Sequence, residues 1–327
     1  MTILVSGSSG HLGEALVRTL QAQRREVVGI DIRPGAFTHL VGSVVDRAFV
    51  RRCMKDVATV LHTATLHKPH VATHSRQEFV DVNITGTLNL LEEAASRGVA
   101  AFVYTSTTSV FGDALVPPPG EPAAWVTEDV TPVPKNIYGA TKAAAEDLCQ
   151  LFARNHSLRT IVLRTSRFFP EEDDNSAVRA AYADANIKAN EFLYRRVDIE
   201  DVVSAHLAAA GRAPSVGFAK YIISATTPFS RADAAELREH APQVVRRYVP
   251  DYEAEYARCG WKMIRGIDRV YVNDKARTEL GWQPHHDFRA LIARLKADGD
   301  VLSPLAREIG RKGYHDRVFS EGPYPVE

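Results

Sequence analysis

Tyr138 and Lys142 lie four residues apart where a helix is expected to begin, in Tyr138-Gly-Ala-Thr-Lys142. A spacing of four residues places two side chains on one face of a helix. A free tyrosine ionises near pH ~10, and a neighbouring ammonium group favours the phenolate, so this tyrosine is suited to exchange a proton with a substrate hydroxyl. The same spacing also occurs at the exposed start of ordinary helices, so other features must support the hypothesis.

A glycine loop near the N-terminus has the surroundings of a nucleotide-binding turn. Gly7, Gly10 and Gly13 follow an apolar run at residues 3–5 and precede a helical stripe of leucines and alanines. Glycines let the backbone approach a pyrophosphate, whose charge then lies at the start of the helix. The spacing G-x-x-G-x-x-G alone is also typical of a simple turn. The preceding strand and the following helix favour a dinucleotide site.

Asp31 ends the second expected strand, residues 27–30, twenty-one residues after Gly10. Dinucleotide-binding folds place an acid at about this distance, where it binds the adenosine ribose. Because a carboxylate repels a 2′-phosphate, Asp31 favours NAD over NADP. Arg33 nearby weakens this preference.

Strands and helices alternate along the rest of the chain. Strands are expected at residues 57–61, 101–105, 160–163 and 221–225, and helices at 79–95, 138–154 and 201–210. Such units predict an α/β fold with a Rossmann-type, doubly wound parallel sheet and a small C-terminal α/β substrate lobe. We expect residues 1–166 and 197–226 to form the NAD-binding domain. Residues 167–196 and 227–327 are expected to form the lobe and a C-terminal tail.

Polar segments surround the expected site. The hydroxyl cluster at residues 105–109 follows a strand, where open α/β sheets bind ligands, although a Ser/Thr turn that bonds its own backbone also explains it. The proline-rich segment 116–134 is expected to be a loop that borders the site. The acidic run at residues 171–174 is expected to face solvent.

Histidines gather after the fourth strand, at His62, His67, His70 and His74, with His39 upstream. Imidazoles at such intervals suit a metal site. No cysteine or carboxylate pattern completes one, so we expect no metal.

The overall composition predicts a protein of the cytoplasm. The chain has 327 residues, 45% of them hydrophobic, with 40 basic and 40 acidic residues. This balance gives no electrostatic reason to expect a nucleic acid or an anionic membrane as partner. Three cysteines without paired spacing indicate a reducing compartment, and no apolar stretch reaches the ~20 residues of a membrane span.

Several separated motifs together resemble the extended short-chain dehydrogenase/reductase family, also called the NAD-dependent epimerase/dehydratases, over residues 3 to about 284. The resemblance rests on Gly7-x-x-Gly10-x-x-Gly13, Asp31, His62-Thr-Ala64, Asn83-x-x-Gly86-Thr-x-Asn89, the Thr-Ser-Thr run before Val110-Phe-Gly112, Tyr138-x-x-x-Lys142 and Leu280-Gly-Trp282-x-Pro284.

The resemblance implies a catalytic triad of Thr107, Tyr138 and Lys142. Tyr138 would exchange a proton with the substrate oxygen, Thr107 would position that oxygen, and Lys142 would lower the pKa of Tyr138 and hold the nicotinamide ribose. The implied NAD contacts are Gly7, Ser9, Gly10, His11, Leu12, Gly13, Asp31, Ile32, Arg33, Ser43, Val44, His62, Thr63, Ala64, Asn83, Thr105, Tyr138 and Lys142. The implied substrate contacts are His67, Ser106, Thr107, Thr108 and Arg167. The resemblance also implies a homodimer.

Three departures from the family pattern concern the substrate. Ser43 stands where an acid commonly contacts adenine, Arg167 replaces a common asparagine, and the segment between Pro170 and Arg196 is short. Together with the acidic run, they favour a free or singly charged sugar, with Arg167 and Arg196 suited to clamp one anionic group. Alternatively, basic residues of the tail, Arg307, Arg311 and Lys312, supply nucleotide contacts.

We therefore expect an NAD-dependent oxidoreductase or epimerase that acts on a secondary alcohol or ketone of a small, sugar-like substrate. Two alternatives remain open at this point. One is a nucleotide-sugar epimerase or dehydratase, and the other is a non-enzymatic NAD(P)-sensing regulator.

Overall fold

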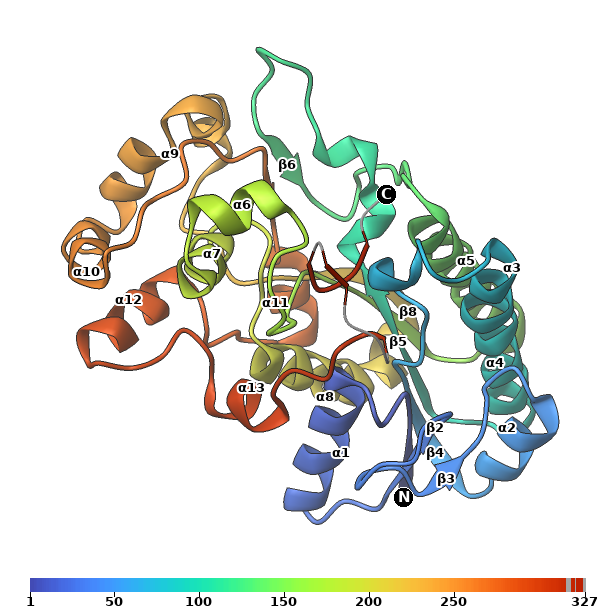
Figure 1. Cartoon of the computed structure of the whole chain (residues 1–327). Helices are drawn as coiled ribbons and strands as arrows, with labels where there is room; N and C mark the ends of the chain where they lie inside the picture. The colour runs from blue at the N-terminus through green and yellow to red at the C-terminus, as the bar shows by residue number, and fades with distance from the viewer. Residues whose placement is uncertain (316–318, 321, 326–327) are drawn as a thin grey trace.

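A seven-stranded parallel sheet forms the centre of the structure, a computed structural model that describes residues 1–315, 319–320 and 322–325 (Figure 1). The strand order is β3-β2-β1-β4-β5-β7-β8. The strands are β1 (Thr2–Ser6), β2 (Val27–Asp31), β3 (Leu40–Val41), β4 (Val57–His62), β5 (Ala101–Thr107), β7 (Thr160–Thr165) and β8 (Phe218–Ile223). The order reverses between β1 and β4, where doubly wound sheets bind their ligands. The predicted fold class is confirmed.

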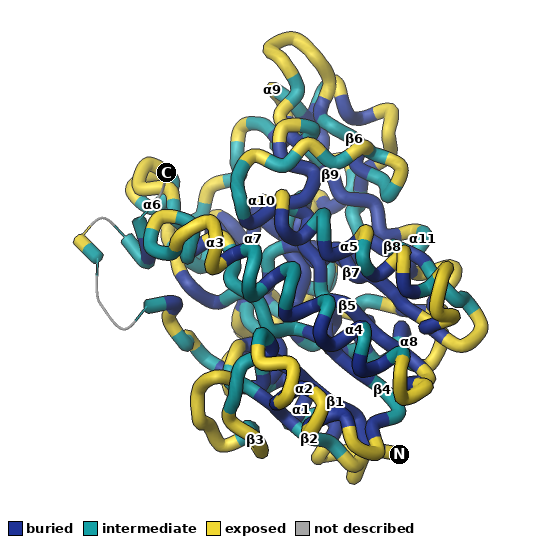
Figure 2. The backbone as a smooth tube through the Cα atoms, turned by 90° about the vertical axis from the view of Figure 1, so that its right-hand side faces the viewer, coloured by how far each residue is buried: buried dark blue, intermediate teal, exposed yellow. Residues whose placement is uncertain are grey.

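Helices cover both faces of this sheet (Figure 1). One face carries α1 (His11–Ala22), α8 (Ile199–Val216), α11 (Asp274–Leu280) and α13 (Pro304–Ile309). The other carries α2 (Arg47–Cys53), α4 (Gly86–Ser96) and α5 (Ile137–His156). Strands buried on both faces are rich in apolar residues, and the fully buried β1 and β7 have apolar centres at residues 3–5 and 161–163. Figure 2 shows the buried strands in dark blue beneath partly exposed helices.

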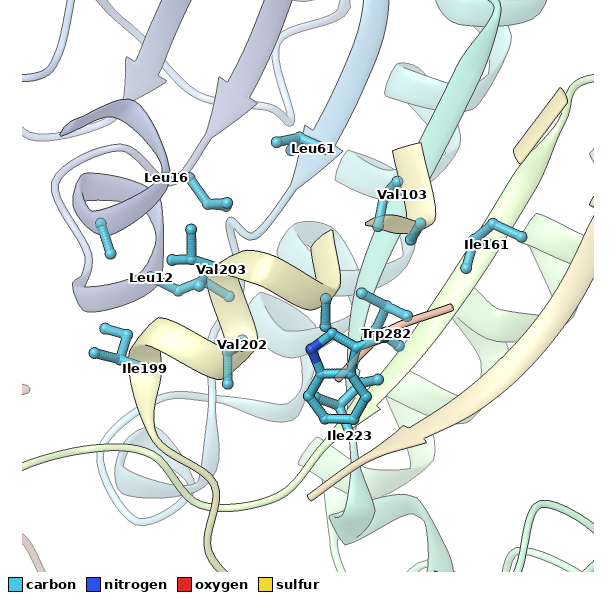
Figure 3. Packing of buried hydrophobic residues seen from close by; sticks show 14 of the residues in the cluster. Leu12, Leu16, Leu61, Val103, Ile161, Ile199, Val202, Val203, Ile223 and Trp282 are labelled. Carbon is cyan, nitrogen blue, oxygen red and sulfur yellow. The ribbon is translucent and has the colours of Figure 1, made fainter. Parts of the chain in front are cut away.

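Trp282 packs into the hydrophobic cluster that α1 and α8 form on one face of the sheet. Its ring lies in the cluster with Leu16 and Val203 (Figure 3), and only 2% of the residue is exposed. The indole nitrogen donates hydrogen bonds to the Asp201 carbonyl at 3.2 Å and to the Ser204 hydroxyl at 3.0 Å. The Leu-Gly-Trp-x-Pro motif therefore fastens the end of α11 to α8.

A second hydrophobic cluster forms the core of the lobe. Its strands are β6 (Ala124–Val126) and β9 (Arg269–Tyr271), which pair in parallel. Its helices are α7 (Asp184–Glu191), α9 (Ala234–Tyr248), α10 (Tyr252–Cys259) and α12 (Phe288–Lys296), and α6 (Ser176–Ala181) precedes α7. β6 lies within the proline-rich segment, which the sequence assigned to a loop of the first domain. Its pairing with β9 joins that segment to the lobe.

Short helical segments complete the described chain. They are η1 (Lys68–His70), α3 (Arg76–Phe79), the π-helix η2 (Val80–Thr85), η3 (Thr108–Phe111), η4 (Asp113–Leu115) and η5 (Arg231–Asp233). The helix predicted at 79–95 is therefore interrupted by a π-helix. No helix in the described part of the chain combines the length and apolarity needed to cross a membrane.

Candidate active site

A cavity of about 490 Å³ opens at the carboxyl ends of β1, β4, β5 and β7. Most of the predicted site residues line it. They are Gly7, Gly10, His11, Leu12, Gly13, Asp31, Ile32, Ser43, Val44, Thr63, Ala64, His67, Thr105, Ser106, Thr107, Thr108, Tyr138, Lys142 and Arg167.

Four predicted contacts lie away from the cavity wall. Ser9 and Arg33 act through backbone N–H groups that donate to Asp31 at 3.0 and 2.9 Å. His62 is 1% exposed and bonds the hydroxyls of Ser6 at 2.7 Å and Thr87 at 2.9 Å, so it joins β1, β4 and α4. Like His62, Asn83 is buried and holds other residues in place.

Asn83 connects the loop after β4 to helix α5 through side-chain hydrogen bonds. Its amide oxygen accepts from the Leu66 N–H, and its amide nitrogen donates to the Leu66 carbonyl, both at 2.9 Å. The same nitrogen donates to the Thr141 hydroxyl at 3.0 Å. Asn83 lies in the π-helix η2, and such bulges commonly aim a side chain at a functional site. We infer that the family asparagine positions the loop and the helix that carries Tyr138.

The glycine loop fits a pyrophosphate because it has no room for side chains. Gly7 has φ of +78°, and a Cβ there would lie 2.8 Å from the Ala64 nitrogen. A Cβ on Gly13 would lie 1.9 Å from the Gly7 carbonyl oxygen. The loop runs directly into α1, whose first N–H groups attract anions. These residues are therefore compatible with a dinucleotide.

Asp31 lies at the end of β2, on the same wall as the glycine loop. Both of its carboxylate oxygens accept backbone N–H groups, from Ser9 and Arg33, which fixes the orientation of the carboxylate. Ile32 beside it is 66% exposed, an apolar surface suited to a flat base.

Asp31 is expected to make NAD bind more tightly than NADP by roughly tenfold or more, because its carboxylate would oppose a 2′-phosphate. Asp31→Asn should reduce the ratio of NAD affinity to NADP affinity. Titration of both variants with each cofactor measures it. Equal affinities in the wild-type protein would show that another group, such as Arg33, determines the preference.

Tyr138, Lys142 and Thr107 meet at the centre of the cavity wall. All three are less than 9% exposed. The Lys142 ammonium donates to the Thr105 carbonyl at 2.6 Å and lies 4.1 Å from the centroid of the Tyr104 ring. Thr107, at the end of β5, accepts the Ser109 N–H at 3.1 Å and hydrogen-bonds the Tyr138 side chain. A substrate oxygen beside Tyr138 would therefore also meet the Thr107 hydroxyl.

The pKa of Tyr138 shifts in the direction opposite to the one expected from the sequence. Burial raises the pKa of Tyr138 to about 12, and the hydrogen bond with Thr107 opposes this only in part. Burial also lowers the pKa of Lys142 to about 7, because charging the ammonium inside the protein is unfavourable. The expectation that Lys142 lowers the pKa of Tyr138 was therefore wrong for the protein alone. Tyr138 is therefore a neutral phenol near pH 7.

The Ser106 hydroxyl is bonded within the protein and does not take a direct role in substrate binding. It donates to Glu146 at 2.6 Å, and Glu146 also forms a buried ion pair with Arg164 at 2.8 Å. Glu146 lies one turn after Lys142 on α5. This network joins β5, β7 and α5 behind the catalytic residues. Ser106 therefore helps to hold these elements, and with them the catalytic side chains, in place.

Two of the four acids in the acidic run, Glu171 and Asp173, face the protein interior, which corrects the expectation that the run faces solvent, whereas Glu172 is exposed. Glu171 and Asp173 are 5% and 2% exposed. Glu171 forms a hydrogen bond with His11 at 2.8 Å, and Asp173 bonds Arg167 at 2.9 Å and Arg195 at 2.6 Å. Asp174 pairs with Lys68. Because these carboxylates are paired with basic groups, their repulsion no longer argues against an anionic substrate.

The proposed clamp of Arg167 and Arg196 was also wrong. Arg196 is 3% exposed and is held by Glu191 at 2.8 Å and by the Phe169 carbonyl. Arg167 lies on the wall, but its guanidinium group already bonds Asp173 and the Glu172 carbonyl.

The C-terminal tail, the dark red segment in Figure 1, folds back toward the central sheet and contributes Tyr314 and Tyr324 to the cavity wall. The N–H groups of Lys312 and Gly313 donate to Glu171 at 3.1 and 3.3 Å. The basic residues of the tail that were an alternative source of nucleotide contacts form ion pairs with acidic residues instead. Arg307 pairs with Asp300, Arg311 with Glu172 and Asp184, and Lys312 with Glu14.

The clustered histidines pack against this tail. The His70 ring centroid lies 4.8 Å from that of His67, 4.9 Å from that of His74 and 5.3 Å from that of His315. Burial lowers the pKa of His70 to about 4, so its ring is neutral near pH 7. The only described group of potential metal ligands in mutual reach is Asp198, Glu200 and His286, away from the cavity.

Several wall residues escaped the sequence analysis. They are Leu66, Lys68, Phe168, Phe169, Arg195, Arg269, Tyr271, Tyr314 and Tyr324. They come from the lobe, the tail and the loops that face them, which no local motif marks.

Residues 3–217 match the NAD dependent epimerase/dehydratase family, and the chain belongs to this family. The resemblance drawn from the motifs is thereby confirmed. Members of this family are enzymes named for their dependence on NAD, which supports NAD as the cofactor of the glycine loop.

Relatives within the family carry out different reactions. The chain is 27% identical over 332 residues to a dTDP-glucose 4,6-dehydratase of Streptomyces antibioticus, covering 90% of this chain and 91% of that protein. It is 25% identical over 330 residues to a 3-beta-hydroxysteroid dehydrogenase of Mycolicibacterium neoaurum, covering 86% and 87%. It is 31% identical over 185 residues to a UDP-glucose 4-epimerase of Erwinia amylovora, covering 50% and 52%. The chain aligns with only about half of the length of that epimerase and of other first-ranked relatives.

Solved structures share the fold. A short-chain dehydrogenase/reductase superfamily protein from Agrobacterium tumefaciens, solved with bound NAD, superimposes with a TM-score of 0.64 at 23% identity, covering 91% of this chain and 97% of that one. MoeE5 in complex with UDP-glucose and NAD gives a TM-score of 0.62 at 23% identity, covering 90% and 96%.

Proposed function

We propose that this protein is an NAD-dependent oxidoreductase or epimerase that acts on a secondary alcohol or ketone of a sugar-like substrate. The observation that carries the proposal is the convergence of Tyr138, Thr107 and Lys142 on the wall of the cavity that also holds the glycine loop and Asp31. A regulator that only senses the dinucleotide needs no buried phenol at this place.

The chain's own residues supply proton transfer and positioning. NAD, when bound, supplies the hydride acceptor or donor. The Tyr138 phenol donates its proton to a substrate carbonyl oxygen in reduction, and in the reverse direction its phenolate form accepts the proton of the substrate hydroxyl. The Thr107 hydroxyl orients that oxygen, and Lys142, held by the Thr105 carbonyl on the same cavity wall, is placed to contact the bound cofactor. The buried Glu146–Arg164 ion pair joins α5 to β7 behind the catalytic residues.

A nucleotide-sugar substrate remains the alternative that the relatives favour. The Streptomyces dehydratase and the Erwinia epimerase are named for such sugars. Pairing of the acidic run removes the main physical argument for a small substrate, so the size of the substrate must be measured.

A substrate panel tests the proposed function. Free sugars, sugar acids, sugar phosphates and nucleotide-linked sugars would be incubated with the protein and NAD. NADH is followed by its near-ultraviolet absorbance, and epimerised or dehydrated products are followed by NMR. Turnover of at least one compound is expected. Tight NAD binding without turnover of any compound would favour the sensing regulator.

We further propose a homodimer formed through α4 and α5. Leu151 on α5 is 36% exposed, and the leucines at 88 and 148 are only partly buried. Light scattering at micromolar concentration should give twice the mass of one chain, and Leu151→Glu should shift the mass toward that of the monomer. Val116→Glu, at an exposed valine outside these helices, is the control. A monomeric mass for the wild-type protein would contradict the proposal.

A further inference from the structure

We propose that residues 310–315 form a strap whose docking against the cavity is coupled to dinucleotide binding. The docked strap retains the cofactor, and NAD in turn holds the strap in place. The strap contributes Tyr314 to the wall that also carries the glycine loop, Asp31 and His11. The proposal rests on the proposed function only for the identity of the cofactor, and its test needs neither a substrate nor turnover.

A buried carboxylate, that of Glu171, anchors the strap. It accepts the N–H groups of Lys312 and Gly313 at 3.1 and 3.3 Å. The Tyr314 hydroxyl donates to it at 3.3 Å. The same carboxylate bonds the Nε2 atom of His11, the first residue of α1, at 2.8 Å. Glu171 therefore links the strap to the residue that follows Gly10 in the glycine loop.

Tyr314 is the buried residue of the strap, with 8% of its surface exposed, whereas the other five residues are exposed or partly exposed. Its ring centroid lies 4.9 Å from that of His67 and 6.0 Å from that of Phe169. His67 belongs to the loop after β4 and Phe169 to the segment after β7, and both line the cavity. The part of the wall that Tyr314 forms therefore exists only while the strap is docked.

The docked strap also offsets negative charge beside the start of α1. Glu14 lies in the first turn of this helix and forms an ion pair with the Lys312 ammonium. Burial raises the pKa of Glu171, but hydrogen bonds from His11 and from the backbone hold it below its usual range, so the group is a carboxylate near pH 7.

Undocking would leave these two acids less compensated. Glu14 would keep its ion pair with Arg18 and lose Lys312, and Glu171 would lose the three donors of the strap. A pyrophosphate bound at the start of α1 would then meet stronger repulsion from both carboxylates. Docking of the strap therefore favours the binding of an anionic dinucleotide.

Glycines allow the strap to turn into its docked position. Gly310 follows the last residue of α13, and Gly313 lies within the strap. Their φ angles are +64° and +67°, which residues with a side chain rarely adopt. A residue other than glycine at position 313 would therefore oppose docking, although this position does not line the cavity.

Coupling between two binding events is reciprocal, so NAD must stabilise the docked strap by the factor by which docking strengthens NAD binding. Limited digestion of the full chain with trypsin measures docking, because cleavage after Arg311 or Lys312 requires the strap to leave Glu171. Mass spectrometry of the intact products identifies this cleavage. Saturating NAD is expected to slow it by roughly fivefold or more.

Gly313→Pro tests the other side of the coupling. Proline removes the N–H group that donates to Glu171 and fixes φ near about −65°, which excludes the docked conformation. NADH release, followed by fluorescence in a stopped-flow instrument, should be roughly fivefold or more faster than in the wild-type protein. Cleavage after Arg311 should become fast and independent of NAD.

Gly120→Pro is the matched control, because Gly120 has φ of +85° and lies exposed in the proline-rich segment. It introduces the same conflict with φ outside the strap and should leave NADH release and strap cleavage unchanged. Lys312→Gln keeps the backbone N–H but removes the ammonium that pairs with Glu14, so it should weaken NAD binding most at low salt. Lys296→Gln, which breaks an ion pair with Asp251, should not.

The proposal is overturned if saturating NAD leaves the cleavage rate of the wild-type strap unchanged, or if Gly313→Pro releases NADH at the wild-type rate. Either result would leave the proposed function standing, because these measurements convert no substrate. Conversely, a protein whose strap is protected by NAD but that converts no sugar would keep the coupling and lose the proposed reaction.

Discussion

Replacing Tyr138 with phenylalanine is expected to lower turnover by about 100- to 10,000-fold, the usual contribution of a general acid or base. The ring remains and fills the same space, so the fold and NAD affinity should persist. Only the proton that the neutral phenol exchanges with the substrate oxygen is lost. Steady-state rates, NAD titration and thermal unfolding together measure these three quantities.

Tyr252→Phe is the matched control for this variant, since Tyr252 is a buried lobe tyrosine that bonds only the Pro242 carbonyl, at 3.3 Å. It should keep the wild-type rate. If Tyr138→Phe retains more than about a tenth of the wild-type rate, Tyr138 is not the acid/base.

Gly13→Ala is expected to have the second large effect. The added Cβ would lie 1.9 Å from the carbonyl oxygen of Gly7 and 2.5 Å from its carbonyl carbon. Both are backbone atoms, so the whole turn must move. NAD affinity should fall by roughly 100-fold or more, and overpacking should lower the free energy of unfolding by about 1–3 kcal/mol.

Gly211→Ala provides the comparison, because a Cβ at this position in α8 would meet nothing within 4 Å. It should leave NAD affinity unchanged and stabilise the helix by about 0.5–1 kcal/mol. Wild-type NAD affinity in Gly13→Ala would show that the glycine loop does not approach the cofactor.

Local patterns in the sequence predicted the parts of the site that local geometry determines. The glycine loop, Asp31 and Tyr138 each follow or begin a regular element, and alternating strands and helices imply the sheet that brings them together. Periodicity located β1 and β4 to within one residue, whereas β8 begins at Phe218 and ends at Ile223, both earlier than the predicted bounds of 221–225.

Long-range pairing determined what the sequence analysis missed. The acidic run seemed exposed because its partners lie far along the chain: Arg195 forms an ion pair with Asp173, and the backbone N–H of Lys312 donates to Glu171. The pKa of Tyr138 depends on burial by the whole cavity wall, which a four-residue spacing does not reveal. Arg269 reaches the site only because β9 pairs with β6 in the lobe.

The most direct test of the account compares the wild-type protein with Tyr138→Phe in a single-turnover experiment. Each protein, with NAD bound, would be mixed with the sugar panel, and NADH absorbance and sugar NMR spectra would be recorded. We expect NADH or a converted sugar with the wild-type protein and neither with the variant. Equal conversion by both proteins, or none by a wild-type protein that binds NAD, would contradict this expectation.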